Sequence, residues 1–336
     1  MKYKRIALVF PGQGSQYAGM GKELYDKYKV VRDVFDEAGN VLGYDISETC
    51  FKKPRLGKKI MHKSDLDRTI YTQPAMFVAG YAFFKLLEEA CQGEDFELRP
   101  SFFAGHSLGE YTALAAAGAM DFRTCMGLVQ KRATYITEFG DHYPDAGLMA
   151  LVDRGGELEA DRVESLCKQF QVYVTLLNTK KQVVVGGFKK NLSDMSKHLK
   201  KEGILAAILK VEGPFHTPLM RPAADRFKKE LDEEKIFVAS KPVIANVTRD
   251  AIVDPDHIRR ELYEQIFTMV DWRGSVEKMV ANGADLFIEV GPKRVLTNMI
   301  RDIDTSVRML NVEDEESLLE TVKELAGREM DAPEGP

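Results

Sequence analysis

The pentapeptide Gly105-His106-Ser107-Leu108-Gly109 contains the residue best suited to nucleophilic chemistry in this chain. A short apolar run, Phe102-Phe103-Ala104, precedes it, and an alanine-rich stretch from Tyr111 to Gly118 follows it. A serine in a G-x-S-x-G turn between a strand and a helix exposes its hydroxyl, because small neighbours permit the sharp turn. We therefore predict that Ser107 is a nucleophile. The first N–H groups of the following helix would stabilise negative charge on its substrate.

A serine nucleophile needs a base within hydrogen-bond reach, and His216 has the most suitable setting among the six histidines. It lies in Gly213-Pro214-Phe215-His216-Thr217-Pro218, where two prolines stiffen the backbone and hold the side chain in one place. A histidine that only caps the following turn fits the local sequence equally well. The other histidines lie in polar stretches, except His106, which we expect to pack behind the nucleophile.

Arg132 is the second residue whose setting points to chemistry. It falls beside an apolar stripe at helical spacing, formed by Phe122, Cys125, Met126, Val129, Ala133 and Ile136. An arginine that points inward needs an anionic partner. That partner is either a buried Asp or Glu in a structural ion pair, or the carboxylate of a substrate, which a guanidinium fork binds through two parallel hydrogen bonds.

A glycine-rich turn, Gly12-Gln13-Gly14-Ser15-Gln16, follows the apolar run from Ile6 to Phe10. Its spacing departs from G-x-G-x-x-G, which argues against a dinucleotide site. At the end of a neighbouring parallel strand, such a turn can bring the backbone N–H of Gln13 to the second side of an oxyanion hole. A plain strand-to-helix turn is the alternative.

Strand-like and helix-like segments alternate along the chain, which predicts an α/β fold with a parallel sheet and crossover helices. The expected strands of that sheet lie at 6–10, 102–104, 242–246 and 285–290, and the expected helices at 20–38, 73–89, 124–139 and 270–281. The segment from Leu148 to Leu209 has the order β-α-β-β-α-β, which is typical of a ferredoxin-like unit. We therefore predict an α/β-hydrolase-like large domain at 1–145 and 212–327, interrupted by a ferredoxin-like small subdomain at 146–211. Such an interruption places a cleft at the junction.

Composition and charge argue against several classes of function. The chain has 336 residues, with 47 Lys and Arg against 52 Asp and Glu, so its net charge of −5 gives no general reason to bind nucleic acid or a membrane. The four cysteines are scattered, without C-x-x-C pairs or histidines at metal-ligand spacing, so we expect no metal site. The first apolar run is too short for a signal peptide or a membrane span, so we expect a cytoplasmic protein with a frayed tail at 328–336.

Seven ordered blocks of the sequence resemble the malonyl-CoA:acyl carrier protein transacylase family, which includes the acyltransferase domains of polyketide synthases. The resemblance spans about Ile6 to Leu325. It implies an acyltransferase that moves a malonyl group from CoA to a carrier protein. The blocks are Pro11-Gly12-Gln13-Gly14-Ser15-Gln16, Thr72-Gln73-Pro74-Ala75, Gly105-His106-Ser107-Leu108-Gly109-Glu110-Tyr111, Arg132, Asn178 before Gln182-Val183-Val184-Val185, Gly213-Pro214-Phe215-His216 and Glu289-Val290-Gly291-Pro292.

The resemblance assigns the chemical roles. By similarity, Ser107 carries the acyl group and His216 is its base. Arg132 matches the residue that binds the free malonyl carboxylate, which favours the substrate reading over the structural ion pair. A backbone carbonyl, here that of Gln265, orients the histidine in place of a triad aspartate. This would explain why the motifs show no third acid.

The resemblance also covers the residues around the acyl group. Gln13 and Leu108 match the residues whose N–H groups form the oxyanion hole. Phe215 matches a position where phenylalanine accompanies malonyl units and serine accompanies methylmalonyl, since the ring fills the volume of an α-methyl group. One methyl group is worth only about 1–3 kcal/mol in pocket discrimination, so some leakage to methylmalonyl is expected. We also place His106 and Asn178 among the substrate-binding residues.

The implied reaction uses malonyl-CoA and an acyl carrier protein with a phosphopantetheine thiol, and it needs no metal or redox cofactor. We expect a monomer. The nearest alternative is an editing thioester hydrolase, because the same serine and histidine release a free acid if water reaches the ester. A transferase for another acyl unit and a noncatalytic carrier-docking subunit are further alternatives.

Three loops depart from the family's pattern. Lys180-Lys181 replaces the usual small residue, proline and glycine near Asn178, and Lys293-Arg294 replaces a glycine-lysine pair. The loop from Lys52 to Arg68 is longer than is common. The added positive charge favours CoA phosphates or an acidic carrier protein. Neutral surface drift is the alternative.

Overall fold

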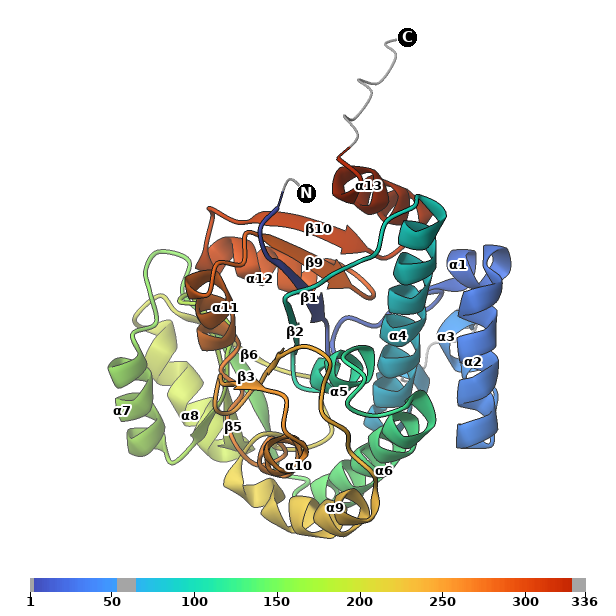
Figure 1. Cartoon of the computed structure of the whole chain (residues 1–336). Helices are drawn as coiled ribbons and strands as arrows, with labels where there is room; N and C mark the ends of the chain where they lie inside the picture. Colours follow the sequence, from blue (N-terminus) through green and yellow to red (C-terminus); the bar gives the residue numbers. More distant parts are fainter. Residues whose placement is uncertain (1–2, 53–64, 328–336) are drawn as a thin grey trace.

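A six-stranded sheet forms the centre of the protein, whose computed structural model describes residues 3–52 and 65–327. The strands follow the order β10-β9-β1-β2-β7-β8, and every neighbouring pair is parallel except β7 with β8 (Figure 1). They span Ile6–Phe10 (β1), Phe102–Gly105 (β2), Val243–Ile244 (β7), Ala251–Ile252 (β8), Leu286–Val290 (β9) and Arg308–Val312 (β10). Every residue of β1 and β9 is buried, as expected for a parallel sheet that is covered on both faces.

Helices cover both faces of this sheet. In β1, Leu8 and Phe10 pack on one face with the long helix α4, whereas Ala7 and Val9 pack on the other face with Trp272 of α11. The helices of the large domain are Lys22–Lys27 (α1), Lys29–Leu42 (α2), Ile46–Phe51 (α3), Thr69–Gly93 (α4), Gly109–Ala116 (α5), Phe122–Gly140 (α6), Arg221–Glu233 (α9), Pro255–Glu264 (α10), Trp272–Ala281 (α11), Val295–Ile303 (α12) and Glu315–Leu325 (α13), with 3-10 turns at Asp65–Asp67 and Pro218–Met220.

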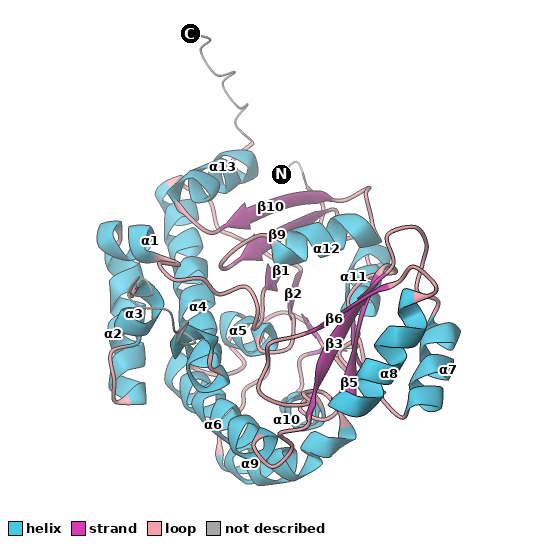
Figure 2. Cartoon of the chain, turned by 180° about the vertical axis from the view of Figure 1, so that it is seen from behind, coloured by secondary structure: helices cyan, strands magenta, loops and turns pink. Residues whose placement is uncertain are grey.

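A second sheet of four antiparallel strands lies beside the large domain, with α7 and α8 on its outer face (Figure 2). Its strand order is β4-β5-β3-β6, which is the order of a ferredoxin-like unit. Leu148, Leu176 and Val184 face the other way and pack with the core of the large domain. Its elements are Ala146–Val152 (β3), Ala160–Phe170 (α7), Tyr173–Leu177 (β4), Gln182–Phe188 (β5), Lys189–Lys200 (α8) and Leu205–Ile208 (β6).

Backbone hydrogen bonds join the small sheet to the large domain at Val270. The N–H of Val270 donates to the carbonyl of Thr175 at 2.9 Å, and the N–H of Leu177 donates to the carbonyl of Val270 at 2.9 Å. This bridge fixes β4 against the segment that leads into α11, and it positions the inner face of the small sheet over the carboxyl end of β2.

The predicted fold class is confirmed, with corrections in detail. The helix expected at 20–38 is two helices, because Tyr28 has an extended backbone (φ −108°, ψ 127°) between α1 and α2. The hydroxyl of Tyr28 donates to Glu315 at 2.9 Å, so a contact from a distant part of the chain accompanies this break. The strand Arg308–Val312 and the helix Val295–Ile303 were not predicted. The strand is too short to show a clear period, whereas the helix repeats apolar residues at helical spacing, at Val295, Leu296, Met299, Ile300 and Ile303, and this signal was missed.

The strands of the second sheet all lie within 146–211, and the division of the chain at 145/146 and 211/212 stays a prediction. The expectations for the tail at 328–336 and for most of the long loop, 53–64, fall outside the described residues. No helix in the described ranges has the length and apolar character needed to cross a membrane.

Candidate active site

Ser107 lies in a sharp turn between β2 and α5, with a φ of 50°. The flanking glycines are required by close contacts. A Cβ on Gly105 would lie 1.9 Å from the carbonyl carbon of Gly109, and a Cβ on Gly109 would lie 2.0 Å from the carbonyl oxygen of Phe10. Asn246 holds the turn, since its Oδ1 accepts from the N–H of Ser107 at 2.7 Å and its Nδ2 donates to the carbonyl of Gly105 at 2.7 Å. The predicted nucleophile turn is therefore present.

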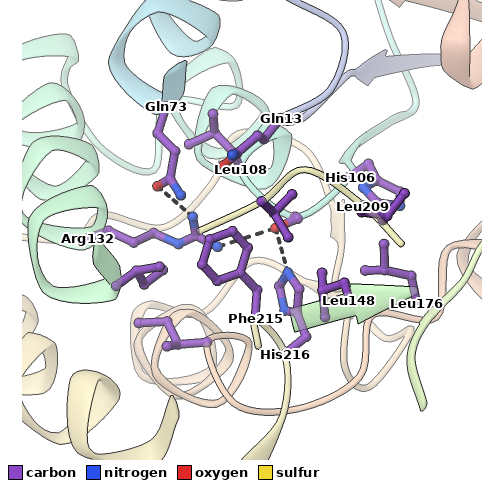
Figure 3. Close-up of a pocket in the computed structure, with 14 residues that line it drawn as sticks. Gln13, Gln73, His106, Leu108, Arg132, Leu148, Leu176, Leu209, Phe215 and His216 are labelled. Carbon is purple, nitrogen blue, oxygen red and sulfur yellow. Dashed lines mark hydrogen bonds between the residues drawn. The ribbon is translucent and has the colours of Figure 1, made fainter. Parts of the chain in front are cut away.

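The imidazole of His216 lies between this serine and a backbone carbonyl. Its Nε2 is 2.8 Å from Oγ of Ser107 (Figure 3). Its Nδ1 is 2.7 Å from the carbonyl oxygen of Gln265. A carbonyl oxygen only accepts, so Nδ1 carries the hydrogen and the lone pair of Nε2 faces the hydroxyl. Burial, followed by the positive charge of Arg132, lowers the pKa of His216 to about 3. The ring is therefore neutral, which is the form that a general base needs.

The guanidinium of Arg132 reaches the same hydroxyl from α6. Its Nη2 lies 3.3 Å from Oγ of Ser107 and donates to Oε1 of Gln265 at 3.0 Å. Its Nη1 donates to Oε1 of Gln73 at 2.7 Å (Figure 3). Its Cζ lies 5.4 Å from the centre of the Tyr111 ring. The residue is 2% exposed, and burial lowers the pKa of Arg132.

All of the partners of Arg132 in the described residues are neutral. No carboxylate in residues 3–52 and 65–327 forms an ion pair with its guanidinium, so the structural ion pair considered above does not occur there. Two amide oxygens and an aromatic face hold the cation in place. Its charge therefore remains available to an anion in the cavity.

Gln13 and Leu108 lie on the wall of the cavity beside Ser107 (Figure 3). A Cβ on Gly12 would lie 2.3 Å from the carbonyl oxygen of His106 and 3.6 Å from the backbone nitrogen of Leu108. The glycine-rich turn therefore packs directly against the turn that carries Ser107. The side chain of Gln13 donates to Oγ1 of Thr69 at 3.2 Å and ties this turn to the start of α4. Over the described part of the chain, the backbone N–H groups of Gln13 and Leu108 donate to no other residue, which leaves both available to an oxyanion.

His106 links the turn that carries Ser107 to the small sheet. Its Nε2 lies 2.8 Å from Oδ1 of Asn178, whose Nδ2 donates to Oε1 of Gln182 at 3.2 Å. The ring also meets the edge of Trp272, with 5.8 Å between ring centres. Burial lowers the pKa of His106, so the ring is neutral and donates to Asn178 from Nε2. His106 lines the cavity as well, whereas Asn178 reaches the site through His106, and a direct contact of either residue with substrate stays a prediction.

The cavity around Ser107 measures about 90 Å³. Phe215, 9% exposed, forms part of its wall next to the base. Both the large domain and the small sheet contribute apolar side chains to its wall. These side chains are Ile136, Leu148, Leu176, Leu209, Val211, Phe215 and Ile266.

Sequence reasoning assigned no role to three residues that hold the site together. Gln73 and Glu110 both lie in sequence blocks that resemble the family, so the resemblance pointed to both residues. Asn246 follows a short strand and carries no such signal. The side chain of Gln265 was also missed, although its carbonyl was assigned, and it contacts both Arg132 and Ser107.

The basic residues that depart from the family's pattern lie outside this cavity. Lys180 pairs with Glu157 at 3.5 Å, and Nζ of Lys293 donates to the carbonyl of Gly14 at 3.4 Å. No group of His, Cys, Asp and Glu among the described residues is arranged to hold a metal ion, and the four cysteines are free and buried.

Comparisons with known proteins agree with this geometry. The model of the family described as "Acyl transferase domain" matches residues 7–327. The malonyl CoA-acyl carrier protein transacylase of Bacillus subtilis (strain 168) is 34% identical over 325 residues, which cover 95% of this chain and 98% of that protein. The crystal structure of an acyl carrier protein S-malonyltransferase from Vibrio cholerae superposes with a TM-score of 0.85 at 34% identity, and covers 95% of this chain and 100% of its own. A malonyl transacylase in complex with its type II polyketide carrier protein superposes with a TM-score of 0.86 at 32% identity, over 96% of this chain and 100% of its own.

Proposed function

Because the chain belongs to the acyl transferase domain family, we propose that it transfers a malonyl group from CoA to the phosphopantetheine thiol of an acyl carrier protein. One observation carries this proposal. Oγ of Ser107 lies within hydrogen-bond reach of both the imidazole of His216, at 2.8 Å, and the buried guanidinium of Arg132, at 3.3 Å. The imidazole activates a nucleophile, and a cation beside it favours an acyl group with a second, negatively charged end.

The first step places the malonyl group on the enzyme. Nε2 of His216 takes the proton of Ser107 as Oγ attacks the thioester carbonyl carbon of malonyl-CoA. The N–H groups of Gln13 and Leu108 stabilise the oxyanion of the tetrahedral intermediate. The C–S bond then breaks, the CoA thiolate takes the proton from His216, and a malonyl ester remains on Ser107.

The second step passes the malonyl group to the carrier. Arg132 binds the distal carboxylate of the ester, while the carrier thiol gives its proton to His216 and attacks the ester carbonyl. The C–O bond breaks, and Ser107 regains its proton from His216. Kinetics are ping-pong, because CoA leaves before the carrier reacts. No metal or redox cofactor is required, since the thioester is already activated and every proton has a named partner.

Further properties of the proposed enzyme follow from the site. Phe215 fills part of the cavity wall and favours malonyl over methylmalonyl. A monomer suffices, because one chain supplies every residue that is given a role. The free, buried cysteines fit a reducing compartment such as the cytoplasm.

Intact-protein mass spectrometry tests the proposal directly. Incubation with malonyl-CoA should add one malonyl group to the wild-type protein and none to Ser107→Ala, and addition of a holo carrier protein should remove the label from the enzyme and place it on the carrier. Rapid loss of the label without a carrier would identify a hydrolase instead. Absence of any adduct on the wild-type protein would refute the proposal.

A further inference from the structure

A buried carboxyl group lies one side chain behind the guanidinium of Arg132. Glu110, in the first turn of α5, is fully buried, and its Oε2 accepts a hydrogen bond from Nε2 of Gln265. Oε1 of the same Gln265 accepts from Nη2 of Arg132 at 3.0 Å. The acid and the cation are therefore joined through a single amide group and do not touch each other. We call this chain of Glu110, Gln265 and Arg132 the relay.

The groups around Glu110 are donors, and this fixes the orientation of the amide. The backbone N–H of Asn246 donates to Oε1 of Glu110 at 3.3 Å, while Nε2 of Gln265 donates to Oε2. The same Nε2 also donates to the carbonyl of Ser107 at 3.0 Å. With Nε2 held by two acceptors, only Oε1 of Gln265 is left to face Arg132. Both oxygens of the Glu110 carboxyl group therefore act as acceptors.

The separation between acid and cation has a chemical consequence. A carboxylate bound directly to Arg132 would occupy the fork that a substrate carboxylate needs. Because one amide group separates it from the cation, Glu110 leaves Nη2 of Arg132 facing Oγ of Ser107. Burial, and then the nearby Glu261, raise the pKa of Glu110 well above its usual range, while the hydrogen bonds from Gln265 and Asn246 and the charge of Arg132 lower it.

We propose that Glu110 is a positioning residue that acts through the side chain of Gln265 to hold Arg132 against the acyl ester, and thereby sets the preference for carboxylated acyl groups. This inference rests on the proposed malonyl transfer and deepens it. It adds a specificity role for two side chains, Glu110 and Gln265, that do not line the cavity.

Glu110→Gln is the decisive variant. A carboxamide offers one acceptor to the two donors, so the amide of Gln265 either loses its partner or turns its Nε2 towards Arg132. The kcat/KM for malonyl-CoA should fall about tenfold to a hundredfold, mostly through KM, since the buried amide that orients the guanidinium loses its acceptor. The kcat/KM for acetyl-CoA, which has no carboxylate, should stay within about twofold.

Glu261→Gln is the matched control. Glu261 is 3% exposed and lies near Glu110, but its side chain accepts from the N–H of Val247 at 2.7 Å and not from the side chain of Gln265. The N–H of Gln265 donates to the backbone carbonyl of Glu261 at 2.8 Å, a bond that the substitution keeps. The Glu261→Gln variant removes a buried carboxyl group of the same kind and leaves the side chains of Glu110, Gln265 and Arg132 in place. The ratio of malonyl to acetyl kcat/KM should therefore not change.

A double-mutant cycle with Arg132→Ala separates positioning from general structure. If Glu110 acts through Arg132, then Glu110→Gln should not alter the malonyl-to-acetyl ratio once Arg132 is absent. Equal losses for both acyl groups in the single variant, or an unchanged ratio, would overturn the inference.

A second variant separates a folding defect from a loss of the relay. If circular dichroism shows that Glu110→Gln does not fold, then Gln265→Met tests the same relay, because it keeps the backbone carbonyl that holds His216. It should lower the malonyl-to-acetyl ratio, and an unchanged ratio would count against the relay. Failure of the wild-type protein to form a malonyl ester would refute the proposed function, whereas normal transfer with an unchanged ratio in the variants would refute the relay alone.

Discussion

Replacement of Arg132 by alanine is expected to reverse the acyl preference of the enzyme. At 2% exposure, the guanidinium acts in a medium far less polarisable than water. Two charges about 4 Å apart interact by about 4 kcal/mol at an effective dielectric constant of 20, and a charge-assisted hydrogen bond contributes about 1.5–3 kcal/mol. After the desolvation of the substrate carboxylate is set against this, a loss of about 3 kcal/mol remains, which corresponds to about a hundredfold fall in kcat/KM for malonyl-CoA.

Acetyl-CoA should respond in the opposite direction or not at all, because it presents only a methyl group to the guanidinium. The assay is a competition between equimolar malonyl-CoA and acetyl-CoA, quenched early and read as the masses of the two acyl-enzymes. Arg132→Lys is the matched control: it keeps the charge but loses the planar fork, so its malonyl preference should fall between those of the wild type and Arg132→Ala. Thermal unfolding of each variant shows whether the loss of the bonds to Gln73 and Gln265 has damaged the fold.

An unchanged malonyl-to-acetyl ratio in a folded Arg132→Ala variant would refute the assignment of this residue as the carboxylate-binding group. Equal behaviour of the lysine variant and the wild type would show that charge alone, and not the fork geometry, determines the preference.

The remaining predictions concern pH and packing. Because burial and the charge of Arg132 lower the pKa of His216 to about 3, kcat/KM should not fall as the pH drops through 6.5. In Arg132→Ala, the pH below which acetyl transfer declines should be higher than in the wild type. The same pH of decline in both proteins would contradict this. Gly109→Ala should destabilise the fold by about 3 kcal/mol or more in denaturant titrations, since its Cβ would meet the carbonyl oxygen of Phe10 at 2.0 Å, and a loss below about 0.5 kcal/mol would show that the turn can relax. Burial raises the pKa of Glu289 to about 7, so the folded state holds that proton more tightly and stability should fall as the pH rises from about 4.5 to 7; Glu289→Gln should flatten this slope, as measured by unfolding midpoints across that range.

The parts of the site that could be predicted are those where one residue type is physically required. Only small residues fit the contacts around Ser107, so Gly105 and Gly109 identify the turn from spacing alone. The apolar stripe on α6 placed Arg132 on the inward face because the helical period fixes direction. His216 could not be separated from a turn cap on local sequence, because its bond to Ser107 joins residues that are 109 positions apart.

The parts that could not be predicted are those that any residue type can supply. The carbonyl that orients His216 is a backbone group, so only the fold or a family resemblance places it at Gln265. The same limit applies to β10, whose five residues become a strand because the edge of β9 is available for pairing. Propensity within so short a segment decides little.

Of the two anionic partners expected for Arg132, no carboxylate in residues 3–52 and 65–327 forms an ion pair with it, and the substrate carboxylate stays a prediction that links specificity to catalysis. Neutral amides and an aromatic ring hold Arg132 without cancelling its charge, and that charge is one of the two main causes that depress the pKa of His216. We expect a bound malonyl carboxylate to offset this charge and raise the pKa of the imidazole, whereas an acetyl group would leave that pKa low. Arg132 would then favour malonyl twice, in binding and in proton transfer, and Arg132→Ala would remove both effects together.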